Sequence, residues 1–160
     1  MLKAHGVEML VDVRTVPRSR HNPQFNRETL PQSLAAAGIQ YEHLPGLGGL
    51  RHARKDSINT GWKNLSFRGY ADYMQTAEFL ENLQRLMEIE KSSRTAILCA
   101  ESVPWRCHRS LIADVLTVRG IPVSHIMSET KTNPHRLTPF ALVNGDRVTY
   151  PAESLHLFHS

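Results

Sequence analysis

The stretch TAILCAESVPWRCHRSLIADVLTVRG, residues 95–120, decides the fold class. Its first six residues form a short apolar run that is typical of a buried strand. The residues after it predict a helix, because Pro104 lies near the expected first turn and Gly120 follows the expected end. A buried strand followed by a helix is the repeating unit of α/β proteins. The stretch therefore predicts an α/β fold.

The same alternation of strand and helix extends along the chain. Further strands are expected at 7–13 (VEMLVDV), 39–44 (IQYEHL) and 122–127 (PVSHIM), and further helices from Asn26 to Ala37 and from Gly69 to Glu90. This order predicts three layers, with a mainly parallel sheet covered by helices on both faces. Asn144-Gly145 between two short apolar runs predicts a C-terminal β-hairpin. With no repeat or linker, we expect residues 1–160 to form a single α/β domain.

The composition is that of a globular domain, with 41% hydrophobic and 21% charged residues among 160. No apolar run approaches the roughly 20 residues that a membrane span requires. The start MLKAHGVEML lacks the basic-then-apolar pattern of a signal peptide. We therefore expect a cytoplasmic protein without a membrane partner, and the sequence indicates neither a cofactor nor an oligomeric state.

Polar side chains follow every predicted strand. They are Asp12 and Arg14 after the first strand, Glu42 and His43 with the turn of Gly48 and Gly49 after the second, Cys99 and Glu101 after the third, and His125 in the last. In open parallel sheets, ligands bind beyond the carboxyl ends of the strands. The pattern therefore predicts a functional site at this edge. The structural alternative is that strand ends meet solvent and become polar for that reason.

The loop at 99–109 holds the reactive candidates. A helix start enlarged by Arg106 and Arg109 creates a positive region that favours an anion. The same field favours thiolate, the nucleophilic form, at Cys99 or Cys107. A disulfide between these cysteines is disfavoured in a reducing cytoplasm, so a free or reactive thiol is expected. The alternative is that both cysteines are small apolar core residues.

A metal site is a further alternative for this loop. It would require Cys99, Cys107 and His108 to converge with His43 or Glu101. The spacing C-x7-C-H is not a standard zinc pattern. We therefore assign no metal ligand.

A basic region offers a different function. Residues 14–68 contain nine Lys or Arg and three Asp or Glu, a net charge of +6 that exceeds the +4 of the whole chain. The excess lies in two irregular segments, 14–27 and 47–69, and the second contains Trp62 and Phe67 as possible stacking surfaces. These segments predict, as the alternative function, a non-catalytic nucleic-acid-binding module.

Five stretches together resemble the uncharacterised bacterial and archaeal proteins grouped as domain of unknown function 488. They are LVDVRTVPRSRHNPQF, YEHLPGLGG, CAESVPWRCHR, VSHI and VTYP. The resemblance implies that Ser19, which no other pattern selects, is a motif position together with Asp12, Arg14, Pro17, Phe25, Gly48, Gly49, Cys99, Glu101, Cys107, His108 and Arg109. Such proteins begin with a strand reading like TIGHS, which we expect this chain to lack. The family implies no activity.

These patterns favour a small enzyme that acts on an anionic or phosphate-bearing substrate at the carboxyl-end edge of the sheet. The expected catalytic residues are Cys99, Glu101, Cys107 and His108. The expected substrate-binding residues are Asp12, Arg14, Ser19, His43, Gly48, Gly49, Arg106 and Arg109.

Overall fold

The computed structural model of the chain describes residues 2–15, 29–49, 51–99 and 108–152. Its helices are α1 (Leu30–Ala36), α2 (Leu65–Tyr73), α3 (Ala77–Ser92) and α4 (Arg109–Val118), with 3-10 turns η1 (Lys3–His5) and η3 (Pro45–Leu47). Its strands are β1 (Met9–Asp12), β2 (Gln40–His43), β3 (Thr95–Leu98), β4 (Ser124–Ile126), β5 (Thr132–Pro134), β6 (Leu142–Asn144) and β7 (Arg147–Thr149). The described residues confirm the predicted mixed α/β fold.

The main sheet has the order β2-β1-β3, and both pairings are parallel. Asp12, the last residue of β1, lies opposite His43 of β2 and Leu98 of β3. The three carboxyl ends therefore meet at one edge of the sheet. Each connection crosses through helical structure, as parallel pairing requires.

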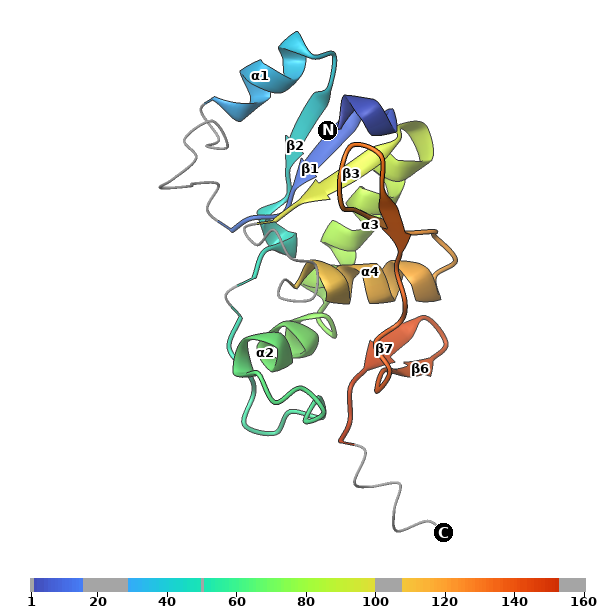
Figure 1. Cartoon of the computed structure of the whole chain (residues 1–160). Coiled ribbons are helices and arrows are strands. Elements are labelled where there is room, and N and C mark those ends of the chain that lie inside the picture. Colours follow the sequence, from blue (N-terminus) through green and yellow to red (C-terminus); the bar gives the residue numbers. More distant parts are fainter. Residues whose placement is uncertain (1, 16–28, 50, 100–107, 153–160) are drawn as a thin grey trace.

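Helices cover both faces of this sheet. Successive side chains of a strand point to opposite faces, so neighbouring residues of β1 contact different helices. Leu10 packs in one apolar cluster with Leu30 and Leu34 of α1. Val11 belongs to the other cluster, together with residues of α3 and α4. Figure 1 shows α1 on one side of the sheet, α3 and α4 on the other, and α2 with the β6–β7 hairpin beyond α4. The predicted three layers are confirmed.

The predicted helix from Gly69 to Glu90 is wrong in one respect, because the chain breaks there into α2 and α3. Thr76 adopts extended backbone between them, and its hydroxyl accepts a hydrogen bond from the Phe79 amide. Asn64 caps the start of α2 in the same way, through the amides of Ser66 and Phe67. Side-chain caps of this kind start helices, and the apolar spacing alone did not reveal them.

The prediction that 122–127 adds a parallel strand to the main sheet is also wrong. Ser124–Ile126 forms β4 and pairs antiparallel with β5. The two strands are close in sequence, so their pairing closes a short loop at small entropic cost. The C-terminal hairpin is confirmed, with Asn144 opposite Arg147, so its turn lies one residue later than predicted, at Gly145 and Asp146. Gly145 has a φ of 64°, which favours glycine.

Candidate functional site

The site lies where the connections after two neighbouring strands separate. The chain leaves β1 for α1 on one face of the sheet, and it leaves β3 for α4 on the opposite face. In open α/β sheets such a divergence opens a crevice at the carboxyl ends of the strands. Arg14 and Cys99, which follow Asp12 and Leu98 closely, therefore lie at this edge of the sheet.

Asp12 and Arg14 pair with each other at this edge. The Arg14 guanidinium donates from Nε to Asp12 Oδ1 at 2.9 Å and from its terminal nitrogen to Oδ2 at 2.7 Å. The hydroxyl of Tyr41 donates to the same Oδ2 at 2.5 Å. Burial alone would raise the pKa of Asp12, but these hydrogen bonds outweigh it and hold the pKa below its ordinary value. The pair is buried at the carboxyl-end edge of the sheet.

His43 and the Gly48–Gly49 turn contact the residues that follow Asp12. The ring Nε2 of His43 lies 2.7 Å from the Arg14 carbonyl oxygen. The Thr15 hydroxyl donates to the Gly49 carbonyl at 3.1 Å. A Cβ on Gly48 would lie 2.3 Å from Thr15 Oγ1 and 2.9 Å from its backbone nitrogen, so this close approach requires glycine. The turn therefore packs against Thr15 and forms one wall of the candidate site.

His108, the N-cap residue of α4, packs behind this wall. Its ring lies 4.6 Å from that of Tyr70, and a Cβ on Gly49 would approach its Nδ1 to 3.2 Å. Burial lowers the pKa of His108 to about 4, and the charges of Arg109 and Arg51 also lower it, against a hydrogen bond with the Leu47 backbone. The imidazole is therefore neutral at pH 7, and the two guanidinium groups nearby favour this form.

Arg51 is held in a fixed position at the same wall. Its guanidinium lies 3.7 Å above the Tyr73 ring, and its Nε donates to the Gly48 carbonyl at 3.3 Å. Tyr73 itself donates to the Gly46 carbonyl at 2.6 Å, which fixes the ring. Among the described residues, none accepts a hydrogen bond from the two terminal nitrogens of Arg51. These donors are available to an anion.

Six predicted site residues are thus brought together by direct contacts along this wall: Asp12, Arg14, His43, Gly48, Gly49 and His108. Arg109 follows His108 as the first residue of α4. Ser19, Glu101, Arg106 and Cys107 lie outside the described residues, as do Pro17 and Phe25. Their predicted roles stay predictions.

Cys99 differs from the expectation of a free thiol. It follows β3, is buried, and has its sulfur in a disulfide. A sulfur in that state carries no thiolate, so a nucleophilic role for Cys99 requires reduction first. Within the described ranges, no three His, Cys, Asp or Glu side chains gather as a metal site would require.

A comparison with known families assigns the chain to one of them. The sequence model described as "Domain of unknown function DUF488" matches residues 1–116. The chain belongs to this family. No curated protein and no solved structure gives a match. In the part of this DUF488 protein that the structure describes, no helix has the length and apolar character needed to cross a membrane.

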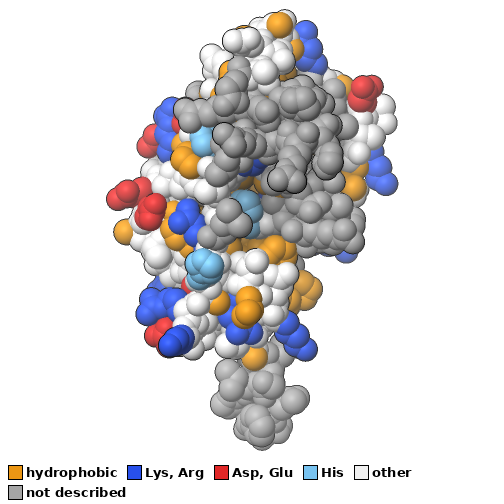
Figure 2. Space-filling view, turned by 90° about the vertical axis from the view of Figure 1, so that its left-hand side faces the viewer, with side chains coloured by type: hydrophobic (Ala, Val, Ile, Leu, Met, Phe, Trp, Pro, Cys, Tyr) orange, Lys and Arg blue, Asp and Glu red, His pale blue; other side chains and the backbone are white. Residues whose placement is uncertain are grey.

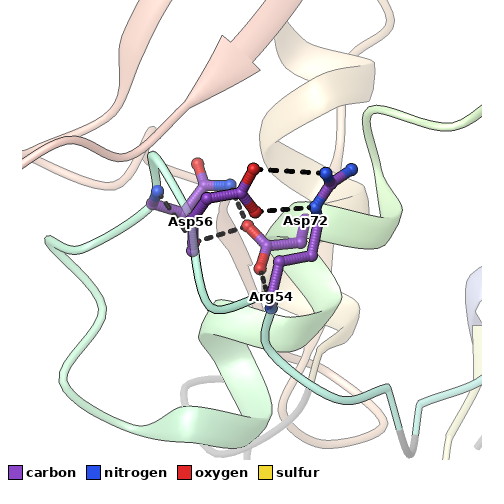
Figure 3. Close-up of polar contacts among 5 residues, drawn as sticks. Arg54, Asp56 and Asp72 are labelled. Atoms are coloured by element: carbon purple, nitrogen blue, oxygen red, sulfur yellow. Dashed lines mark hydrogen bonds and ion pairs between the residues drawn. The ribbon is translucent and has the colours of Figure 1, made fainter.

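The basic segment at 51–68 is an ordered part of the DUF488 domain. Asp72 of α2 accepts hydrogen bonds from the Arg54 amide at 2.8 Å, the Ser57 hydroxyl at 2.6 Å and the Asn59 amide group at 2.7 Å. Figure 3 shows these contacts and the exposed ion pair between Arg54 and Asp56. One buried carboxylate therefore fastens the segment to the core.

Trp62 of this segment is packed on other rings. It makes edge contacts with Phe67 and Phe140 at 4.9 Å and lies 5.5 Å from Tyr150. On the described part of the face in Figure 2, Lys and Arg side chains are scattered, with acidic side chains between some of them. Neither arrangement favours the interpretation of the segment as a platform for stacked bases.

Sequence reasoning did not select several polar residues that make close contacts in the structure. Arg51 was counted only as part of a basic segment, although it lies two residues after Gly49. Asp114 and His135 were not selected, and they lie 2.7 Å apart. Asp114 did give a signal, because a single acidic residue stands within the apolar run LIADVL of a helix. A buried charge in such a position needs a partner.

Proposed function

We propose that this protein is a small enzyme that binds an anionic or phosphate-bearing substrate in the crevice at the carboxyl ends of β1, β2 and β3. The observation that carries the proposal is Arg51. Its guanidinium is fixed by the Tyr73 ring and the Gly48 carbonyl, while its terminal nitrogens have no acceptor among the described residues. A positioned guanidinium with two remaining donors matches the geometry of phosphate and carboxylate groups.

A neutral imidazole beside this cation supports an enzyme rather than a simple binding module. His108 lies close enough to Arg51 and Arg109 for both charges to lower its pKa. An anion bound by the two arginines would therefore lie near a group that can accept a proton at neutral pH. Burial is the main cause of the low pKa of His108, and a bound anion would offset the smaller contribution of the two arginines. The substrate thus promotes proton uptake at the site.

The predicted chemistry at 99–109 belongs to the same proposal. Glu101 and His108 are the proposed proton-transfer groups, and Cys99 or Cys107 is the proposed nucleophile of the reduced protein. Because Cys99 is in a disulfide, its role as a nucleophile applies only under reducing conditions. The anion site itself does not depend on it, because Arg51 and His108 hold their positions through other contacts.

Thermal melts test the anion site. Sulfate or phosphate should raise the Tm of the wild-type protein by a few degrees more than chloride does at equal ionic strength, because a ligand of the native state stabilises it. Arg51→Gln should abolish the difference between the anions. Arg54→Gln is the matched control, because Arg54 lies in the same segment but is exposed and paired with Asp56. Equal losses in both variants would contradict a site at Arg51.

Fluorescence anisotropy with oligonucleotides at several salt concentrations separates this proposal from the nucleic-acid alternative. We expect weak binding that does not depend on sequence and changes little in Trp62→Ala. Tight binding at physiological salt that is lost in Trp62→Ala would favour a base-stacking module instead. Circular dichroism of the variant provides the control for its fold, because Trp62 contacts three other rings.

A further inference from the structure

Helix α2 contacts the wall of the candidate site through one of its faces. Gly69 and Tyr73 lie one helical turn apart, and Tyr70 lies three residues before Tyr73, so the three residues share a face. All three are buried. Each of them contacts the chain at 46–49 or at 51–53. The wall is therefore built against α2.

Three consecutive carbonyl groups of the turn accept hydrogen bonds in this region. The Tyr73 hydroxyl donates to the Gly46 carbonyl at 2.6 Å. The Tyr70 hydroxyl donates to the Leu47 carbonyl at 2.8 Å. The carbonyl after it accepts from Arg51 Nε at 3.3 Å. Two of these bonds join the turn to α2 and the third joins Arg51 to the turn, so the position of the guanidinium depends on α2.

The Tyr73 ring also supports Arg51 directly. The guanidinium carbon lies 3.7 Å from the centroid of the ring, so the ring covers one face of this planar cation. Because Nε donates to a carbonyl, the two terminal nitrogens are the donors that remain. An anion with two oxygens on one atom fits such a pair of parallel donors. The ring thus fixes the plane in which the anion is bound.

Gly69 allows the backbone of residue 51 to lie against α2. A Cβ on Gly69 would overlap the Arg51 carbonyl oxygen and would lie 2.7 Å from the carbonyl carbon and 2.8 Å from the Ala53 nitrogen. Any larger side chain must therefore displace this segment, and with it the Arg51 side chain. The close approach at Gly69 fixes the backbone, whereas the Tyr73 ring fixes the guanidinium.

The same helix contacts the imidazole of the proposed site. The centroid of the Tyr70 ring lies 4.6 Å from that of His108 and 6.1 Å from that of Tyr73. Arg51, Tyr73, Tyr70 and His108 are therefore joined in that order by ring contacts. Because both tyrosines belong to one turn of a helix, the spacing between the cation and the imidazole is held by a rigid element.

We propose that Gly69 and Tyr73 are positioning residues of the anion site, which set where the Arg51 guanidinium lies. The inference rests on the proposed function for its ligand. It adds that the affinity for an oxyanion depends on the position of Arg51, which α2 determines, as well as on its charge. Two parallel hydrogen bonds to one anion require aligned donors, so a displaced guanidinium loses at least one of them.

Titration with inorganic phosphate, followed by NMR at the amides of Gly48 and Gly49, tests the role of the ring. Tyr73→Leu removes the ring and should weaken phosphate binding by about tenfold. Tyr73→Phe keeps the ring and loses one hydrogen bond, so it should weaken binding by about threefold at most. Leu86→Ala is the matched control for lost packing, because Leu86 is buried in the same apolar cluster but belongs to α3. It should lower the Tm and leave the phosphate affinity unchanged.

Gly69→Ala tests the backbone contact, and it keeps the proposal testable if Tyr73→Leu fails to fold. Protons above an aromatic ring resonate upfield, so the side-chain protons of Arg51 report its position without any anion. Gly69→Ala should remove this upfield shift and weaken phosphate binding, although Tyr73 is unchanged. Ser66→Ala, at an exposed position of the same helix, is the matched control and should change neither property.

The outcomes separate this inference from the proposed function. If the wild-type protein binds phosphate and both Tyr73→Leu and Gly69→Ala bind it as tightly, the anion site stands and the positioning role fails. A loss in Leu86→Ala as large as that in Tyr73→Leu would show that affinity follows stability alone, and would also overturn the positioning role. If the wild-type protein binds no phosphate although Arg51 shows the upfield shift, the proposed function fails, and the inference fails with it.

Discussion

Asp72 and Asp114 are two aspartates in similar positions with different partners. Each lies buried within a helix, Asp72 in α2 and Asp114 in α4, and each accepts at least three hydrogen bonds. The donors to Asp72 are a backbone amide, a hydroxyl and a side-chain amide, none of which titrates near neutral pH (Figure 3). The donors to Asp114 include the imidazole of His135, which continues to a second imidazole.

This difference separates a carboxylate whose donors do not titrate near neutral pH from one that also has a histidine donor. Burial and the number of hydrogen bonds do not distinguish the two, because any buried carboxylate must be satisfied by donors. The chemistry of the donors does, since only a titratable donor connects the carboxylate to a proton that can move. Asp72 fastens the segment at 54–59, whereas Asp114 orients a histidine.

The largest expected effect comes from removing either carboxylate. Asp114→Ala leaves four donors without an acceptor and should lower the free energy of unfolding by about 4 kcal/mol, and Asp72→Ala leaves three and should lower it by about 3 kcal/mol. Urea denaturation measures both losses. A loss below about 1 kcal/mol in Asp72→Ala would show that the 54–59 segment does not depend on that residue. Asp72 and Asp114 would then not be equivalent as buried acceptors.

The stability of the protein should depend on pH through His108. The pKa of His108 is about 4 in the folded protein, below its ordinary 6.5. Between these values the unfolded chain binds a proton that the folded chain does not, so stability falls as the pH decreases from 6.5 to about 4. The expected loss is about 3 kcal/mol.

Urea denaturation at several pH values measures this dependence. His108→Gln should flatten the stability curve, and His52→Gln, which changes an exposed histidine, should not. Asp72→Asn should lower stability at neutral pH, because three donors lose their charged acceptor. A slope that persists unchanged in His108→Gln would show that other groups cause the acid sensitivity.

Removal of one hydroxyl donor from each aspartate gives the smallest effect. Ser57→Ala takes one donor from Asp72, and Thr138→Val takes one from Asp114, so each should cost about 1 kcal/mol in urea denaturation. Similar costs would show that the two carboxylates are stabilised alike and differ only in their connection to histidine. A cost of about 3 kcal/mol for Thr138→Val alone would mean that the Asp114 network depends on cooperativity between its donors.

The sequence by itself determined the three parallel strands, the layers and the edge of the sheet at which polar residues gather. Short apolar runs at 7–13, 39–44 and 95–100 predicted strands, and the parallel topology places Asp12 and His43, at two of the strand ends, at a common edge. Those properties follow from local periodicity and from the parallel topology, which brings carboxyl ends together.

Only the tertiary structure decided which polar groups are paired and which are available. Arg14 and Arg51 are the same type of residue. Arg14 is buried against Asp12, whereas the two terminal nitrogens of Arg51 have no acceptor among the described residues. Asp114, His135 and His125 are up to 21 residues apart in sequence, and no local pattern relates them. A hydrogen bond forms only within a narrow range of donor–acceptor distance, so shifts of a few tenths of an ångström between segments decide whether it forms. Such distances are set by packing, which the order of residues along the chain does not express.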